Sequence, residues 1–314
     1  MPHLLTRLTH PTGQPAVATT AGAVPTASAP APRWRLTTRR RATGTDSPAR
    51  RALDWTLIGA LVGVTVLAAA APLLAPYDPV QPVGVPKLAP LADGHLLGTD
   101  QIGRDTLSRT LIGLRTSWLL SLLVCAVGLC VGTLVGLVAG TLGGWVDAVL
   151  MRTTEVFLAL PSMLVAVAVV AALGPGLFNT LFAVSIVWWP YYARIVRGEV
   201  RAIVARPHVE AARMAGVGPL RLTARHVLPG VVPTAIVTAS LDIGNVVTVL
   251  ASLSFLGLGQ PAPAPELGAD TSRALVDILD AWWIPLVPGL VVMLLSLLSN
   301  LAGDALRNRL AHRR

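Results

Sequence analysis

Residues 210–229 read EAARMAGVGPLRLTARHVLP and separate two long apolar runs of the chain. The stretch starts as a helix former, is broken at Gly216 and at the glycine–proline pair after it, and restarts at Leu220. We therefore expect two short helices at an angle, lying on a membrane face with their polar sides toward water. A soluble partner could bind there, or the segment could be an ordinary amphipathic interfacial helix. These residues by themselves leave both interpretations open.

The composition around this stretch is that of a membrane protein. Of the 314 residues, 53% are hydrophobic and 13% are charged, whereas about a quarter of a soluble domain is charged. A membrane-spanning helix needs roughly 20 mostly apolar residues. The sequence therefore predicts an all-α membrane protein with six transmembrane helices, at about 54–76, 116–140, 153–173, 178–197, 231–257 and 284–303.

The basic residues predict the orientation. With the amino terminus inside, the inside segments hold 20 of the 25 lysines and arginines. The positive-inside rule then puts both termini of this multi-pass protein in the cytosol. Nucleic acid is not an expected partner, because no soluble domain carries the charge. Arg39, Arg40 and Arg41 either contact anionic membrane lipids or only anchor the topology.

The second apolar run carries glycines at a strict four-residue spacing, which puts them on one helical face. In lipid, close backbone packing drives helix association. We therefore predict a helix-packing role, although a helix that slides against its neighbour would show the same pattern. The residues are Gly128, Gly132, Gly136 and Gly140.

The fifth run holds polar residues at membrane depth. Asp242, Asn245 and Thr248 recur at three-residue spacing and share a broad face. A charge near mid-bilayer is costly, so Asp242 must face protein or water. We predict that these three residues and Ser252 line a translocation pathway. An interhelical hydrogen-bond network, or a protonated Asp242, would explain the same pattern.

Several segments together resemble one family. EAA at 210–212, followed by Gly216 and by Leu228-Pro229, resembles the EAA loop of ABC-importer permeases. Other segments look like the dipeptide/oligopeptide/nickel permease family, in particular the "C" subunit of its permease heterodimer. They are GTDQIGRD (98–105), GGWVDAVLMR (143–152), LALPSMLVA (158–166), ASLSFLGLG (251–259), PLVPGL (285–290) and NLAGDALR (300–307).

The resemblance covers roughly residues 52–310 and implies a fold, a function and partners. The fold would be that of a type I ABC importer permease (MetI-like), in the bacterial inner membrane. With a sister permease, the chain would form the pathway for di- or oligopeptides, or for a related solute such as nickel. Two cytosolic ABC ATPase subunits and an extracytoplasmic substrate-binding protein would complete the importer. The ATPase-coupling loop would contain Glu210, Ala211, Ala212, Gly216, Leu228 and Pro229.

The expected organisation follows from the runs and the resemblance. A short helix capped by Asp100, containing Arg104 and Asp105, is expected in the first outer loop. Leu250 and Leu267 depart from the family pattern, which often has an acidic residue and a tryptophan there, and both are expected near the outer mouth and pathway. The segments are a disordered basic cytosolic tail (1–50), an N-terminal transmembrane helix (51–76), an extracytoplasmic loop (77–112), an ABC transmembrane type-1 domain (113–307) with the coupling loop at about 198–229, and a cytosolic tail (308–314).

The sequence also indicates that this chain is not an enzyme. A P-loop needs the lysine of GxxxxGK[ST], and the single lysine, Lys87, lies in an outer loop. We expect no catalytic residues, no metal site and no cofactor here, with ATP and Mg²⁺ bound by the partner ATPases. The alternative is a proton-coupled secondary transporter with Asp242 as the relay, which would usually show an inverted repeat and would leave the EAA loop unexplained.

Overall fold

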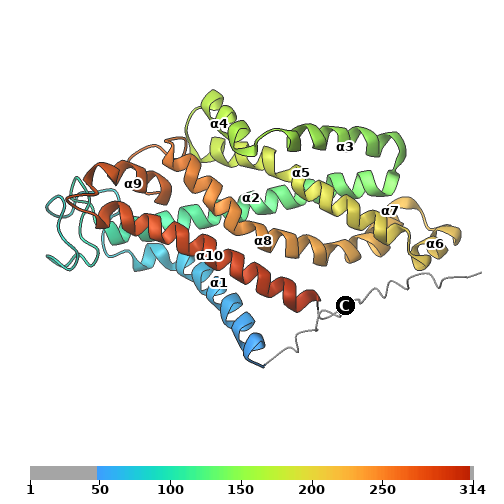
Figure 1. Cartoon of the computed structure of the whole chain (residues 1–314), viewed down its shortest axis with the longest axis horizontal. Coiled ribbons are helices and arrows are strands. Elements are labelled where there is room, and N and C mark those ends of the chain that lie inside the picture. Colours follow the sequence, from blue (N-terminus) through green and yellow to red (C-terminus); the bar gives the residue numbers. More distant parts are fainter. Residues whose placement is uncertain (1–47, 312–314) are drawn as a thin grey trace, which may run out of the picture. The chain divides into compact units, whose positions relative to one another are not determined.

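The computed structural model describes residues 48–311, so most of the predicted amino-terminal tail and the last three residues lie outside the described part. Every regular element in that part is a helix, which confirms the all-α class (Figure 1). A π-helical turn (Thr223–Val227) leads into α8, and a 3-10 turn (Leu275–Asp277) follows α9. The helices are α1 (Pro48–Leu74), α2 (Thr106–Leu142), α3 (Gly144–Ala159), α4 (Ser162–Leu173), α5 (Leu177–Val204), α6 (Pro207–Met214), α7 (Pro219–Leu222), α8 (Leu228–Phe255), α9 (Leu267–Ala274) and α10 (Trp283–Ala311).

The described part holds four helices that are long and apolar enough to cross a membrane, or five if one bent pair counts as a span. These four helical stretches are Pro48–Leu74, Thr106–Leu142, Pro219–Phe255 and Trp283–Leu310. All six predicted runs fall on helices, but the runs 153–173 and 178–197 are not among these four stretches.

The predicted span 153–173 is the bent pair. α3 ends at Ala159, and α4 starts at Ser162 after a bend of 88°. Leu160 between them is extended, at φ −88° and ψ 142°. A residue that precedes proline is pushed out of the helical region, so Pro161 explains why the helix breaks here. The continuous span predicted from hydropathy is corrected to two helices.

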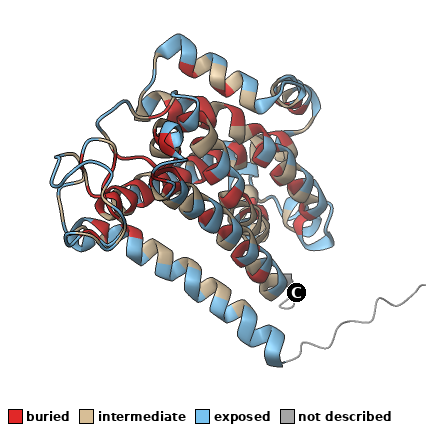
Figure 2. Ribbon diagram, turned by 60° about the vertical axis from the view of Figure 1, so that its left-hand side comes forward, coloured by how far each residue is buried: buried red, intermediate tan, exposed pale blue. Residues whose placement is uncertain are grey.

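The predicted run 178–197 corresponds to α5, which is long enough to cross a membrane but is not among the four helices that are also apolar enough. Tryptophan, tyrosine and asparagine lower its hydropathy, and arginines follow from Arg194 onward. Its position explains this composition, because α5 packs against α2, α3, α4 and α8. Figure 2 shows buried residues gathered in the middle of the bundle, while α1 is exposed along most of its length.

The loop between α1 and α2 is shorter than the predicted 77–112, because α2 begins at Thr106. Asp105 is the N-cap of α2, and its Oδ2 accepts a hydrogen bond from the Ser108 backbone N–H at 2.7 Å. The short helix that we expected after Asp100 does not form. Instead, Asp100 Oδ1 accepts from the backbone N–H groups of Ile102 and Arg104, at 3.0 and 2.9 Å. The carboxylate therefore caps a turn rather than a helix.

The two positions that depart from the family pattern lie in the hydrophobic core, not at the mouth or pathway. Leu250 is buried with Val124 and Val184, and Leu267 is buried with Trp118 and Leu295. An acidic side chain in such a site would need partners for its charge. Leucine at both positions therefore reflects packing inside this chain.

Candidate functional site

The predicted coupling loop, as seen in the structure, consists of α6, a turn at Gly216, and α7. Gly216 has φ of 79°, and a Cβ placed there would have no neighbour within 4 Å. Glycine is favoured at such a backbone angle, so the sequence break and the structural break coincide. Figure 1 shows α6 and α7 together at one end of the bundle.

The inner side of this loop is fastened to α5 and α8 by apolar contacts. Val209 and Val227 are fully buried and Leu222 is nearly so, in one cluster with Val200 and Ile203 of α5. Full burial of such a side chain stabilises by about 1.5–3 kcal/mol. The loop is therefore held on the ends of two long helices and can transmit a force to them.

On the opposite side of this loop, most of the predicted coupling residues are open to solvent. Glu210, Ala211 and Gly216 are exposed, and Ala212 is half-buried. Leu228 and Pro229 are not at the tip of the loop, because they form the first turn of α8.

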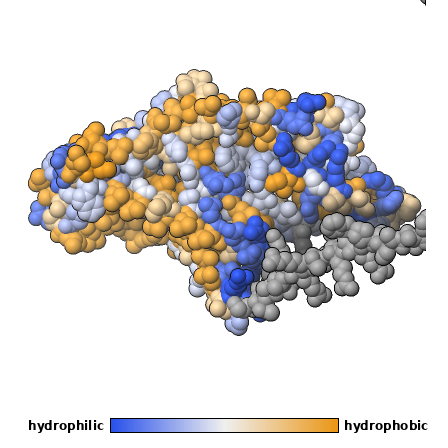
Figure 3. Space-filling model, in the orientation of Figure 1, coloured by the Kyte–Doolittle hydropathy of each residue, from blue (hydrophilic) through white to orange (hydrophobic). Residues whose placement is uncertain are grey.

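Two large apolar side chains at the tip escaped the prediction. Met214 is 80% exposed and Leu220 is 83% exposed, one on each side of the Gly216 turn. Leu220 also lines a groove of about 810 Å³ between the loop and the carboxyl end of α2. Their presence in an otherwise polar segment was the available signal, because exposed apolar groups gathered in one place mark an interaction surface. Figure 3 shows hydrophobic residues over much of this face of the molecule and hydrophilic ones toward the end with α6.

The four glycines of α2 face α5. A Cβ on Gly132 would lie 2.6 Å from the Trp189 carbonyl oxygen, and a Cβ on Gly136 would lie 2.7 Å from the Ala193 carbonyl oxygen. A Cβ on Gly140 would lie 2.5 Å from Val200 Cγ1, and one on Gly128 would lie 3.1 Å from a ring carbon of Tyr192. The two helices therefore approach backbone to backbone, as small residues at a packed interface permit.

Asp242, the predicted pathway acid, points into the contact between α8 and α5. Its Oδ2 accepts hydrogen bonds from the Tyr192 hydroxyl at 2.9 Å and from Trp188 Nε1, and its Oδ1 accepts one from Asn245 Nδ2 at 3.3 Å. The residue is 7% exposed. A buried carboxylate is tolerated when donors surround it. The sequence analysis did not predict Trp188 and Tyr192 as partners of Asp242, although two aromatic donors one helical turn apart in an apolar run were a usable signal.

The other predicted pathway residues lie on the open side of α8. Asn245 and Thr248 are exposed, and Ser252 is half-buried. The Oγ1 of Thr248 lies 2.9 Å from Ser296 Oγ on α10. Thr248 and Ser252 line a hollow of about 340 Å³ between α8, α9 and α10. The structure therefore turns Asp242 toward α5 and leaves the other three residues of the set on or beside an open face.

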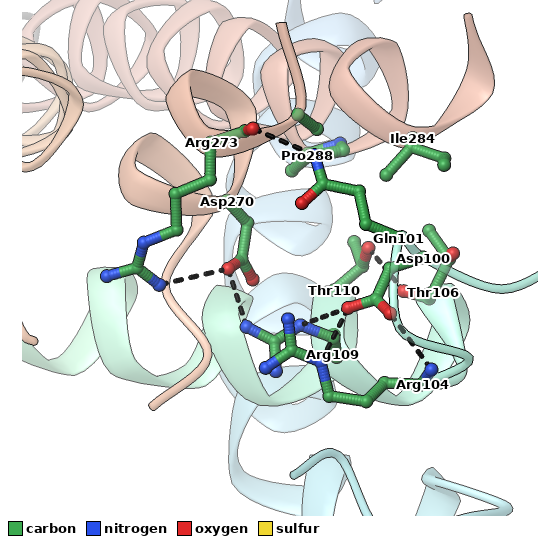
Figure 4. A pocket seen from close by; sticks show the side chains of 11 residues that line it. Asp100, Gln101, Arg104, Thr106, Arg109, Thr110, Asp270, Arg273, Ile284 and Pro288 are labelled. Atoms are coloured by element: carbon green, nitrogen blue, oxygen red, sulfur yellow. Dashed lines mark hydrogen bonds and ion pairs between the residues drawn. The ribbon is translucent and has the colours of Figure 1, made fainter. Parts of the chain in front are cut away.

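A charged cluster at the opposite end joins the loop between α1 and α2 to α9 (Figure 4). Arg109 of α2 donates to Asp270 Oδ1 of α9 at 2.6 Å and to the Pro79 carbonyl oxygen at 2.8 Å. Arg104 Nε donates to Asp100 Oδ2 at 2.6 Å. These side chains enclose a cavity of about 50 Å³, which is small enough to suit water.

Two acids at this end, Asp270 in the cluster and Glu266 beside it, have pKa values shifted by burial. Burial raises the pKa of Asp270 above its ordinary value, and the neighbouring Arg109 opposes that rise. Burial likewise raises the pKa of Glu266, while the Ser254 hydroxyl that donates to it acts in the opposite direction. Arg109 and Asp270 hold two separate segments together, and the GTDQIGRD stretch contributes the neighbouring Asp100 and Arg104.

Comparisons with known proteins agree with the resemblance seen in the sequence. Residues 132–313 match the family described as binding-protein-dependent transport system inner membrane component. The chain is 42% identical over 246 residues to the di/tripeptide transport system permease protein DppC of Pseudomonas aeruginosa (strain UCBPP-PA14), covering 76% of this chain and 81% of that protein. It is 41% identical over 264 residues to the dipeptide transport system permease protein DppC of Escherichia coli (strain K12), covering 80% and 88%.

The fold has a counterpart among solved structures. A chain of the MetNI methionine ABC transporter in inward-facing conformations superimposes with a TM-score of 0.52, over 64% of this chain and 96% of its own. The sequence identity is 19%, so this likeness concerns the fold. The family match and the two permease relatives, together with this fold, show that the chain belongs to the binding-protein-dependent transport system inner membrane component family, a family of transport permeases.

Proposed function

We propose that this chain is the permease subunit of an ATP-driven importer for di- or tripeptides or a related small solute. The observation that carries the proposal is the loop of α6 and α7, with its buried apolar inner side and its exposed Met214 and Leu220. A loop that is both fastened to the bundle and open to a partner suits the transfer of motion. The peptide substrate is inferred from the two permease relatives, whose names refer to dipeptides and di/tripeptides.

The complex would contain a sister permease, two cytosolic ATPase subunits and an extracytoplasmic substrate-binding protein. ATP and Mg²⁺ would bind to the ATPases, because this chain lacks the P-loop lysine. The excess of arginine in alternate loops supports an inner-membrane orientation with both termini in the cytosol. The proton-coupled alternative is not favoured, since the Asp242 carboxylate already accepts hydrogen bonds from Trp188, Tyr192 and Asn245.

The mechanism would be a two-state movement. When ATP draws the ATPases together, the loop of α6 and α7 moves with them. Val209, Leu222 and Val227 pass this displacement to α5 and α8 through the apolar cluster. The bundle then changes between inward-open and outward-open states, and ATP acts through its differential affinity for the two.

The pathway would run along the open side of α8. Asn245, Thr248 and Ser252 supply amide and hydroxyl groups there, and such groups can replace part of the hydration shell of a polar solute. Asp242 would act one layer deeper, by holding α8 against α5. This division of roles separates three candidate lining residues from one that supports the helix.

The substitution Gly216→Arg tests the coupling loop. A Cβ at this position meets no atom within 4 Å and the residue is exposed, so the protein should insert, while the charged side chain would project from the turn toward the proposed partner. We expect loss of peptide uptake and of ATPase co-purification. Gly257→Arg is the matched control, because Gly257 also has positive φ and an empty surrounding but lies at the far end of α8. ATPase retained by Gly216→Arg, or lost equally from both variants, would refute the assignment of this loop.

A further inference from the structure

The turn between α2 and α3 places a buried acid next to the coupling loop. Gly143 and Gly144 have φ of 65° and 55°, so α3 starts within one residue of the end of α2. Asp147 lies in the first turn of α3 and is 6% exposed. It belongs to the GGWVDAVLMR stretch, to which nothing above assigns a role.

The Asp147 carboxylate binds two arginines of α5 at once. Its Oδ1 accepts from Arg197 Nε at 2.6 Å, and its Oδ2 accepts from Arg197 Nη2, also at 2.6 Å. The same Oδ2 accepts from Arg201 Nη2, one helical turn further on. A bidentate arginine–carboxylate pair fixes both distance and orientation. The Asp147 side chain of α3 therefore binds two successive turns of α5.

These contacts lie just before the coupling loop. Arg201 is three residues from the end of α5 at Val204, and α6 starts at Pro207. Between them, the Ala205 N–H donates to the Arg201 carbonyl oxygen at 3.3 Å and so continues the helix into the connection. Any force on α6 therefore reaches α5 at the turns that Asp147 holds.

The packing around the pair limits alternative movements. A Cβ on Gly140 would already touch Val200 of α5, so the end of α2 lies tight against the same turns. A second ion pair of α3, Arg152–Glu155, differs because it is exposed and stays within its own helix. The Asp147 contact joins two helices, and the Arg152 contact does not.

We propose that Asp147 is a positioning residue that locks α3 to the last turns of α5, so that displacement of the coupling loop moves α3 as well as α5. Without the Asp147 carboxylate, Arg197 and Arg201 would lose their shared acceptor. The end of α5 would then move without α3. The inference rests on the proposed function of the coupling loop and extends it to α3.

The test uses the full complex in proteoliposomes, with Cys125 and Cys130 replaced by serine. Spin labels at Val149→Cys on α3 and His208→Cys on α6 report the separation of the two helices, without and with ATP trapped by vanadate. We expect one separation in both states with Asp147 present, and in Asp147→Asn a separation that shifts and broadens on trapping. Asp147→Glu should restore the wild-type behaviour, and Arg152→Gln is the matched control on the same helix, because Arg152 is exposed and its ion pair stays within α3.

The functional readout is the ratio of dipeptide uptake to ATP hydrolysis, measured with dialanine. We expect Asp147→Asn to lower this ratio by roughly tenfold, within the usual range of coupling between sites, while ATPase co-purification is retained. If Asp147→Asn does not insert, Arg201→Gln removes one contact of the set and should lower the ratio by a smaller factor. An unchanged ratio together with a fixed separation would overturn the inference alone, whereas a wild-type chain that binds no ATPase would overturn the proposed function with it.

Discussion

At the scale of single residues, the position of Asp242 differs from the one that its sequence spacing predicts. The spacing of Asp242, Asn245 and Thr248 predicts one polar face, and the structure divides that face in two. The carboxylate turns toward Trp188 and Tyr192, while the other two side chains remain open. The division could not be predicted, because residues three apart lie about 60° from each other around a helix, so the three side chains spread over about 120°.

The substitution Asp242→Asn separates support from transport. The amide oxygen can accept only part of the hydrogen bonding that the carboxylate receives, and an unsatisfied buried donor costs about 1–3 kcal/mol. We expect a lower unfolding temperature in detergent and unchanged ATPase co-purification.

Thr248→Val is the matched control for this substitution, because Thr248 is exposed and nearly isosteric with valine. It removes an exposed hydrogen bond to Ser296, so it should lower the unfolding temperature less than Asp242→Asn does, and it should reduce peptide uptake. Full thermal stability of Asp242→Asn with altered uptake would instead assign Asp242 to the pathway.

At the scale of elements, the helices could largely be predicted from apolar runs, and their ends could not. Pro161 carried the information for the break between α3 and α4, but a hydropathy window averages across one proline. The start of α2 was also encoded, since Asp105 followed by Ser108 is an N-capping pattern. The prediction treated α5 as one more apolar span, although its tryptophan, tyrosine and asparagine residues were the available sign of a helix enclosed by protein.

The contact between α2 and α5 gives a prediction at this scale. Gly132→Ala places a methyl group 2.5 Å from Tyr192 Cβ and 2.6 Å from a backbone oxygen, so a helix must shift. Overpacking of this kind costs about 1–3 kcal/mol. Thermal unfolding of the purified chain should show the loss.

Gly59→Ala in α1 is the control for the glycine contact, since a Cβ there has no neighbour within 4 Å. It should be neutral or slightly stabilising, because alanine is the better helix former. Equal stability of Gly132→Ala and Gly59→Ala would contradict the close approach of α2 and α5.

At the scale of the whole molecule, the two ends of the bundle differ. One end carries the loop of α6 and α7, with Met214 and Leu220 exposed beside buried anchors. The other end carries the Arg109–Asp270 pair, which joins α9 to the loop between α1 and α2. The break at Gly216 could be predicted from the sequence, whereas the Arg109–Asp270 pair joins residues 161 positions apart and has no local signal.

The most direct test of the account is crosslinking from the exposed tip of the coupling loop. A photoreactive group attached at Met214→Cys, in a background without native cysteines, would be activated in the intact complex in native membranes. Leu279→Cys is the control, because Leu279 is 93% exposed and lies in the connection between α9 and α10. We predict a crosslinked P-loop ATPase from position 214 and none from position 279. The absence of an ATPase product at position 214, or equal products from both positions, would contradict the account.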